Sequence, residues 1–157
     1  PQERVGSAWM PTLEAAAAGI AAADFGARGF ALMGISAARM HHVTPRAVGV
    51  AVVAAPRRRK TIELTDRRAA VRFLVRDLEV MDLELMETDL GRCLVTTPEQ
   101  TLLDLSHRAG QRGLTEDVAA AMRALAPLCD PEELEVIAGR QRLGRALGRL
   151  RREGLGP

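Results

Sequence analysis

The chain has 157 residues, of which 47% are hydrophobic and 27% charged, so it has the size and composition of a globular domain with one buried core. Its net charge is only +2, and aromatic residues make up 3% with no tyrosine, which argues against nucleic-acid binding by base stacking. The longest apolar run, residues 15–23, is too short to span a membrane, and no basic leader precedes it. We therefore expect a cytoplasmic protein without a membrane partner.

The N-terminal part of the chain predicts two helices. Residues 1–8 show no periodicity and indicate a linker or a disordered start, and the first residue is Pro1 rather than Met, which suggests a piece of a longer polypeptide. Thr12 can cap a helix whose apolar residues follow helical spacing until the segment 24–26 ends it. Ser36 is expected to cap a second, short helix that runs to about His42.

The middle of the chain predicts strands. After a turn at 44–46, residues 48–53 are apolar on both faces and indicate a strand buried on both sides. Residues 61–64 and 71–76 read as a hairpin with Arg72 and Arg76 on a positively charged outer face. Residues 82–88 indicate either a strand or a loose connection, and residues 93–96 a further strand.

A strongly signalled helix follows this last strand. Thr97 is expected to be its N-cap, with Pro98 at the first helical position and Gln100 completing a capping box. The apolar stripe of this helix consists of Leu102, Leu103, Leu105 and Ala109. Asp104 lies off that stripe, so we expect it to be exposed and to form an i,i+4 ion pair with Arg108.

The C-terminal third of the chain predicts further helices. Thr115 caps one that stops at Pro127, and Asp130 caps another, with Glu133 closing a capping box. The last helix has an apolar side and an arginine side. The sum is an α+β fold, with a mixed central sheet of four to five strands covered by N-terminal and C-terminal helices. We expect one domain over residues 9–152 and a flexible tail at 153–157.

Two stretches carry a resemblance to a known family. Residues 94–105 (LVTTPEQTLLDL) resemble the strand-to-helix signature of the C-terminal domain of AbiEi-type antitoxins. The residues of this chain that match the signature include Thr97, Pro98, Gln100 and Asp104. Residues 29–41 (GFALMGISAARMH) are similar to the family's glycine, serine and alanine-alanine segment. The resemblance covers roughly residues 28 to 126. These motifs are structural rather than catalytic.

The resemblance implies a function in phage defence. AbiEi-type proteins are the antitoxin and transcriptional-regulator halves of type IV (abortive infection) toxin-antitoxin systems, and they repress their own operons. It implies a nucleotidyltransferase-like toxin and operator DNA as partners, the DNA being bound mainly by an N-terminal winged helix. The residues before the match are too few for that module. The toxins carry Gly-Ser followed by an Asp-x-Asp pair, whereas no such pair follows Gly6-Ser7.

The residues themselves indicate no catalytic site. The sequence lacks a phosphate-binding loop, a GxSxG elbow and an HExxH motif. Cys93 and Cys129 lie 36 positions apart and indicate reduced thiols, and the three histidines do not form a ligand pattern, so we expect no metal and no cofactor. Asp82 and Glu84 could be weighed as a two-carboxylate site, but a solvated acidic face is the simpler interpretation.

Charge blocks supply the binding candidates. Residues 57–76 contain eight basic and two acidic residues, residues 77–89 six acidic and no basic ones, and residues 140–153 six basic and one acidic residue. Blocks of opposite sign suggest faces with different partners, although a solvated arginine-rich surface is the alternative. Toxin-contact candidates are Asp82, Glu84 and Glu87. Candidates for contacts with DNA phosphates are Arg57, Arg58, Arg59, Lys60, Arg72, Arg76, Arg142, Arg145 and Arg149.

Three functional hypotheses follow from these observations. The first is a non-enzymatic antitoxin domain that also takes part in autorepression. The second is a free-standing nucleic-acid-binding domain without a toxin partner, and the third is an enzyme of a kind that the sequence motifs do not reveal. A neighbouring toxin gene separates the first two, and stabilisation by a divalent metal or a nucleotide would favour the third.

Overall fold

The computed structural model describes residues 9–44 and 49–157. The predicted linker at 1–8, most of the predicted turn at 44–46 and the start of the predicted strand at 48–53 lie outside these residues. The elements in chain order are α1 (Leu13–Phe25), β1 (Ala31–Leu32), α2 (Gly34–Met40), β2 (Val50–Ala55), β3 (Ile62–Glu63), β4 (Ala70–Val75), β5 (Leu83–Thr88), β6 (Gly91–Thr96), α3 (Pro98–Arg112), α4 (Glu116–Leu125), the 3₁₀ turn η1 (Ala126–Leu128), α5 (Pro131–Arg140) and α6 (Gly144–Arg152).

The strands of the described residues form one mixed sheet in the order β3-β4-β2-β1-β6-β5. Strands β3 and β4 pair antiparallel, as do β2 with β1 and β6 with β5, whereas β4 with β2 and β1 with β6 pair parallel. The sheet has six strands, so the prediction of four to five is wrong by the short strand β1. The sequence did not predict β1 because a strand of two residues is too short to show an alternating apolar pattern. In the structure it lies in the centre of the sheet, where Leu32 pairs with Val53 on one side and Val95 on the other. Residues 82–88, left open between strand and connection, contain the strand β5.

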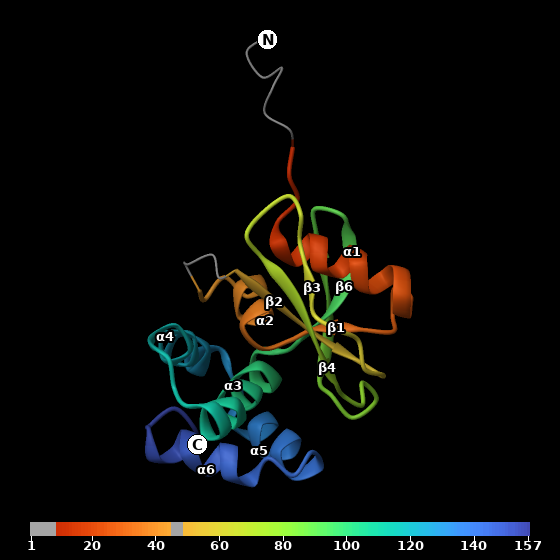
Figure 1. Cartoon of the computed structure of the whole chain (residues 1–157). Coiled ribbons are helices and arrows are strands. Elements are labelled where there is room, and N and C mark those ends of the chain that lie inside the picture. Colours follow the sequence, from red (N-terminus) through yellow and green to blue (C-terminus); the bar gives the residue numbers. More distant parts are fainter. Residues whose placement is uncertain (1–8, 45–48) are drawn as a thin grey trace.

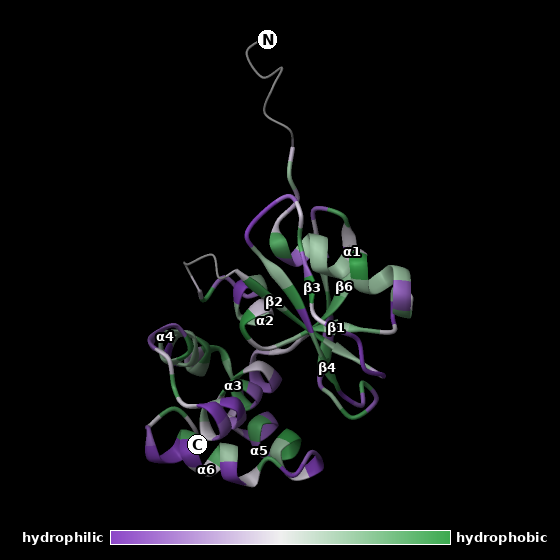
Figure 2. Ribbon diagram, viewed as in Figure 1, coloured by the Kyte–Doolittle hydropathy of each residue, from purple (hydrophilic) through white to green (hydrophobic). Residues whose placement is uncertain are grey.

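Helix α1 covers one face of the sheet, as Figures 1 and 2 show. Thr12 caps it, because its hydroxyl accepts from the backbone N–H of Ala15 at 3.2 Å, as the sequence predicts. Its alanine side packs on the sheet, where Ala17, Ala21 and Val53 are fully buried. The chain then turns sharply through Gly29, where a Cβ would lie 1.8 Å from the carbonyl oxygen of Phe25.

Helix α2 lies between two hydrophobic cores, the one between α1 and the sheet and the one among the C-terminal helices. Its consecutive residues Ala37 and Ala38 are buried in the first and the second core, respectively. The prediction that Ser36 caps this helix is wrong, because the helix begins at Gly34. The Ser36 hydroxyl instead accepts from the backbone N–H of Val52 at 2.8 Å, just where β2 leaves its pairing with β1. A serine near a helix start can bond outside its own helix when a neighbouring strand offers a free N–H group.

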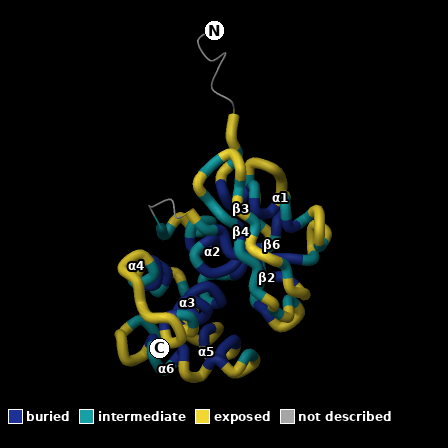
Figure 3. Tube along the Cα trace, in the orientation of Figure 1, coloured by how far each residue is buried: buried dark blue, intermediate teal, exposed yellow. Residues whose placement is uncertain are grey.

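The remaining helices gather around α3 at one side of the sheet, away from α1 (Figures 1 and 3). Helices α4, α5 and α6 pack on α3, and their core contains Leu102, Leu105, Met122, Ile137 and Leu150, all buried. The predicted apolar stripe of α3 and the apolar side of α6 are therefore buried. Covering of the sheet itself by the C-terminal helices is not confirmed, because they pack on α3 and on one another.

The C-terminal tail makes contacts of its own. Leu155 packs against the helical core, and its backbone N–H donates to Leu150 O at 2.8 Å. The side chain of Arg151 donates to the carbonyl oxygen of Pro157 at 2.9 Å. The predicted flexibility of residues 153–157 stays a prediction, but these contacts oppose it.

Candidate functional site

The first turn of α3 joins the sheet to the helices. Thr97 is its N-cap, accepting from the backbone N–H of Gln100 at 3.3 Å, and Pro98 stands at the first helical position, as the sequence predicts. The Thr97 hydroxyl also donates to the Asp82 carboxylate at 2.7 Å, and the Thr97 N–H donates to Asp82 O at 3.1 Å. The connection before β5 is thereby fixed to the start of α3.

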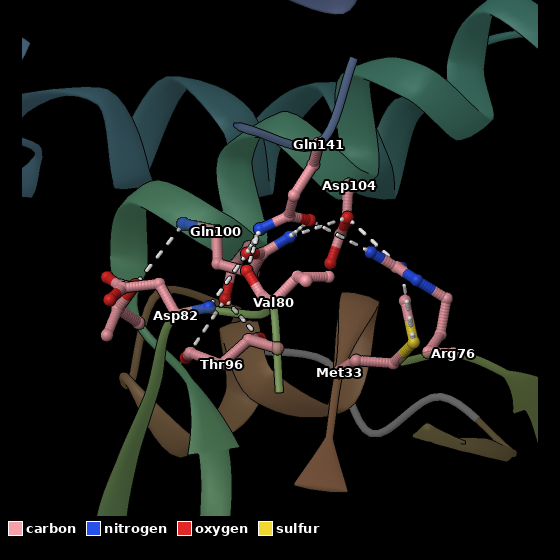
Figure 4. A network of polar contacts seen from close by, with 10 residues as sticks. Met33, Arg76, Val80, Asp82, Thr96, Gln100, Asp104 and Gln141 are labelled. Carbon is pink, nitrogen blue, oxygen red and sulfur yellow. Dashed lines mark hydrogen bonds and ion pairs between the residues drawn. The ribbon is translucent and has the colours of Figure 1, made fainter. Parts of the chain in front are cut away.

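Gln100 does not close the predicted capping box. Its side chain is fully buried and points into a polar network between the sheet and the helices (Figure 4). Its amide forms a reciprocal pair with Gln141, with Gln100 Nε2 to Gln141 Oε1 at 3.0 Å and Gln141 Nε2 to Gln100 Oε1 at 2.6 Å. Gln100 Oε1 also accepts from the Asp82 N–H at 3.0 Å, and Gln141 Nε2 donates to Val80 O at 2.9 Å. The network therefore holds the turn before α6 to the loop before β5.

Asp104 is the charged centre of this network, and the prediction of an exposed Asp104 paired with Arg108 is wrong. The residue is only 7% exposed, and its Oδ1 accepts from Arg76 Nη1 at 3.2 Å and from Gln100 Nε2 at 3.1 Å. Burial raises the pKa of the Asp104 carboxyl, while the Arg76 charge and the hydrogen bonds from Gln100 and Arg76 partly oppose that shift. Its second oxygen, Oδ2, is buried and has no hydrogen-bond partner among the described residues.

A cleft of about 790 Å³ opens beside this network. One wall is the face of β2 and β4 that α1 does not cover, and the opposite wall consists of α3, α4 and the α5–α6 turn. Its apolar part includes Ile35, Val50, Val52 and Leu74. Arg72 lies beside Val52 in the β2–β4 register, so it projects from the same face of the sheet. The predicted outer face of the hairpin, with Arg72 and Arg76, is therefore a wall of this cleft.

Five arginines line the cleft, which we call the cationic cleft: Arg72, Arg76, Arg108, Arg112 and Arg142. Arg76 is bound by Asp104, Gln141 and the sulfur of Met33. The other four have no ion pair or side-chain hydrogen bond within the part of the chain that the structure describes. Burial, together with the charges of Arg72 and Arg112, lowers the pKa of Arg108. The neighbouring charges of Arg72, from the sheet wall, and Arg112, from α3, thus add to burial in disfavouring the charged form of Arg108.

The predicted phosphate contacts at the turn 57–60, which we call the basic turn, lie elsewhere. The Arg57 guanidinium lies 4.6 Å from the ring centroid of Phe25 and donates to Asp24 O at 3.2 Å. Arg59 lies 5.1 Å from the ring centroid of Phe73 and forms an ion pair with Asp24. Both are held against the end of α1, whereas Arg58 and Lys60 are exposed and have no partner among the described residues.

The predicted contacts on the last helix are separated as well. Arg142 lies in the α5–α6 turn with a φ of 57°, at the cationic cleft. Arg145 is exposed on α6. Arg149 crosses α3 at Gly110, where a Cβ would come within 2.4 Å of its guanidinium nitrogen. The nine predicted DNA contacts therefore fall into three groups rather than one surface.

The predicted toxin contacts also differ in their surroundings. Asp82 is bonded to Thr97, as described above. Glu84 and Glu87 lie on β5, which is an edge strand, and alternation sends them to opposite faces. Glu87 is exposed and forms an ion pair with Arg92 at 3.3 Å. Only Asp82 of the three bonds to the N-cap of α3, so Glu84 and Glu87 are the residues whose carboxylates can be changed without disturbing the start of that helix.

Sequence reasoning missed Gln141, Arg108 and Arg112 as site residues. Arg108 and Arg112 are spaced i,i+4 on α3, which was a signal for a shared helix face. Gln141 offered no signal, because its partner Gln100 is 41 positions away.

Other possible sites are weaker. Both cysteines are free; burial raises the pKa of Cys93, and burial together with Glu99 raises that of Cys129 to about 12, so neither thiol is activated. Among residues 9–44 and 49–157, no three His, Cys, Asp or Glu side chains are grouped to hold a metal. Over the same residues, no helix has the length and apolarity needed to cross a bilayer.

Comparison with known proteins identifies the domain. Residues 30–152 match the AbiEi antitoxin C-terminal domain family. The chain belongs to this family. The match runs from β1 to the end of α6, so the AbiEi domain includes the polar network and the cationic cleft. No curated protein matches the chain.

A solved structure shares the architecture of this AbiEi domain. It is described as an antigenic nucleotidyltransferase-like protein from Paracoccidioides brasiliensis, and it matches with a TM-score of 0.59 over 92% of this chain and 91% of that chain. The two sequences are 11% identical, so the likeness concerns the fold alone.

Proposed function

We propose that this AbiEi domain is a non-enzymatic antitoxin component of a type IV toxin-antitoxin system. It counteracts a nucleotidyltransferase-like toxin and takes part in the autorepression of its operon. The observation that carries the proposal is the family match over residues 30–152, which includes the whole sheet and every helix after α1. The buried carboxylate beside the cleft, Asp104, supports a structural rather than a catalytic role, because it is held by Arg76 and Gln100.

We assign the toxin contact to the edge strand β5. An edge strand presents unpaired backbone groups to a partner, and here it adds the exposed Leu85 and the acidic Glu84 and Glu87. A basic surface of the toxin would be complementary to these carboxylates. Asp82 is excluded from the test because its bonds to Thr97 stabilise the start of α3.

The test is growth rescue in cells that express the neighbouring toxin. The double variant Glu84→Lys/Glu87→Lys should lose rescue, because the charge of the strand is reversed. The matched control, Glu63→Lys/Asp66→Lys, makes the same charge change at exposed positions in and beside β3, the opposite edge of the sheet, and should still rescue. Rescue by the β5 variant would remove the assigned surface, and failure of the unsubstituted chain to rescue would overturn the antitoxin role of these residues.

We further propose that the free cations of the basic turn contribute phosphate contacts to operator binding. Arg58 and Lys60 are exposed and have no partner among the described residues, unlike Arg57 and Arg59. If each neutralises one phosphate, replacing both with Gln should reduce the slope of log Kd against log salt by about 1.8. The slope is measured with operator DNA by fluorescence anisotropy. An unchanged slope would show that this turn does not contact DNA.

A further inference from the structure

The cationic cleft has the properties of a ligand site that the antitoxin role does not use. Its volume of about 790 Å³ lies within the range of about 300–1,000 Å³ that is usual for small-molecule pockets. It lies between the sheet and α3, away from the edge strand β5. Its lining combines arginines with aliphatic side chains, which restricts the ligand that can fill it.

The charged part of the cleft calls for an anion with several oxygens. Arg72 comes from the sheet, Arg108 and Arg112 come from α3, and Arg142 comes from the α5–α6 turn. None of the four has an acidic partner among residues 9–44 and 49–157, although Asp117 also lines the cleft. Guanidinium groups bind phosphate oxygens through paired N–H donors, so neighbouring arginines suit a polyphosphate better than a single carboxylate. Burial, and then the charges of Arg72 and Arg112, lower the pKa of Arg108, and a bound polyphosphate would offset those two charges.

The apolar part of the cleft calls for a second, uncharged half of the ligand. Val50, Val52 and Leu74 cover the sheet wall beside Arg72, and Ile35 extends this surface toward the helices. Such aliphatic walls bury a planar or apolar group but bind no phosphate. A buried acceptor, Asp104 Oδ2, stands unpartnered in the same lining and disfavours a ligand that is anionic throughout.

We propose that the cationic cleft binds a nucleoside triphosphate, with the phosphates on Arg72, Arg108, Arg112 and Arg142 and the nucleoside against the aliphatic wall. A polynucleotide is the less suitable ligand, because its successive bases need several stacking platforms and His107 supplies the one ring in the lining of the cleft. The proposal is of binding without turnover, which leaves the domain non-enzymatic, and it is independent of toxin neutralisation, which we assign to β5.

Equilibrium binding to each of the four ribonucleoside triphosphates tests the proposal. At least one should saturate a single site per chain. In the double variant Arg108→Gln/Arg112→Gln its affinity should fall at least tenfold, because two charge-assisted contacts are lost. The matched control, Arg140→Gln/Arg152→Gln, removes the same charge from exposed arginines of α5 and α6 outside the cleft and should bind like the unsubstituted chain. Thermal unfolding of each variant verifies that it is folded.

Two further probes separate the parts of the ligand. Inorganic tripolyphosphate should bind more weakly than the nucleotide, because it does not contact the aliphatic wall, and the free nucleoside should bind more weakly still. The proposal is overturned if none of the four nucleotides saturates, if the double variant binds as well as the control, or if tripolyphosphate binds as tightly as the nucleotide. Saturation by duplex DNA without saturation by any nucleotide would overturn it as well and identify a nucleic-acid surface.

Discussion

The basic turn and the cationic cleft are both arginine-rich, yet they differ in what surrounds the charge. At the basic turn, Arg57 and Arg59 lie over the rings of Phe25 and Phe73, and both bind Asp24. At the cleft, four of the five arginines have no such partner in the described chain, and the pKa of Arg108 is lowered. An arginine that is packed on a ring and paired already stabilises the fold, whereas a group of unpaired ones is available to a ligand.

Arg76 is the exception among the cleft arginines, because it pairs with a buried carboxylate, that of Asp104. Replacing it should therefore have the largest effect on stability. Arg76→Met should lower the free energy of unfolding by about 3–5 kcal/mol, since it leaves the Asp104 carboxylate buried without its countercharge. Urea denaturation measures the loss. Arg142→Met, in the same cleft but exposed, should change stability by less than about 0.5 kcal/mol. Equal losses in the two variants would contradict the pairing.

A smaller loss is expected at the basic turn. Phe73→Leu removes the ring beneath Arg59 and the tilted contact with Phe25, whose centroid is 6.1 Å away, so stability should fall by about 1–2 kcal/mol. A double-mutant cycle with Arg59→Gln isolates the contact between the cation and the ring. Strict additivity of the two changes would show that the ring serves only as an apolar filler.

The pH dependence of stability sharpens the description of the cleft. The pKa of Asp104 is raised above its ordinary value of 3.8, so the folded state binds more protons than the unfolded state just above that pH. The contribution of this group to stability is therefore greatest at low pH and is lost as the pH rises through the raised pKa. Asp104→Asn should remove this component, which denaturation of both proteins across the acidic range would detect. A pH-independent difference would contradict the raised pKa.

The smallest expected changes in stability come from replacing one arginine by Gln in each region, and they should have opposite signs. Arg108→Gln should slightly stabilise the ligand-free protein at low salt, because a partly buried cation beside Arg72 and Arg112 is removed, and the gain should shrink at about 1 M salt. Arg59→Gln should destabilise it instead, since the pair with Asp24 is broken. Melting temperatures at two salt concentrations measure both. The same sign for both variants would end the distinction between the regions.

Local signals in the sequence predicted local structure well. Thr97 and Pro98 define the start of α3 because a cap and a fixed φ act within one turn. Asp130 caps α5 in the same way, accepting from the Glu132 N–H at 2.9 Å. Its own N–H donates to Glu99 at 3.2 Å, so the predicted capping box with Glu133 is replaced by a tertiary contact.

The candidate site depends on contacts between distant residues, which a single sequence does not reveal. Asp104 is bonded to Arg76, 28 positions earlier, and this pair turns a position off the apolar stripe into a buried one. The charge of residues 57–60 was visible, but not that Phe25 and Phe73 would lie beneath two of them. Helical spacing shows which side chains share a face, and only the tertiary fold shows what that face meets.

The position of β1 has a consequence for the order of folding. This two-residue strand joins β2 to β6, and its pairing of Leu32 with Val95 connects residues 63 positions apart. Contacts between such distant residues close a large loop, so we expect the halves β3-β4-β2 and β6-β5 to form early and to join slowly. Leu32→Ala should then accelerate unfolding with little effect on the refolding rate in stopped-flow experiments. The centre of the sheet would thus be the last part of it to form.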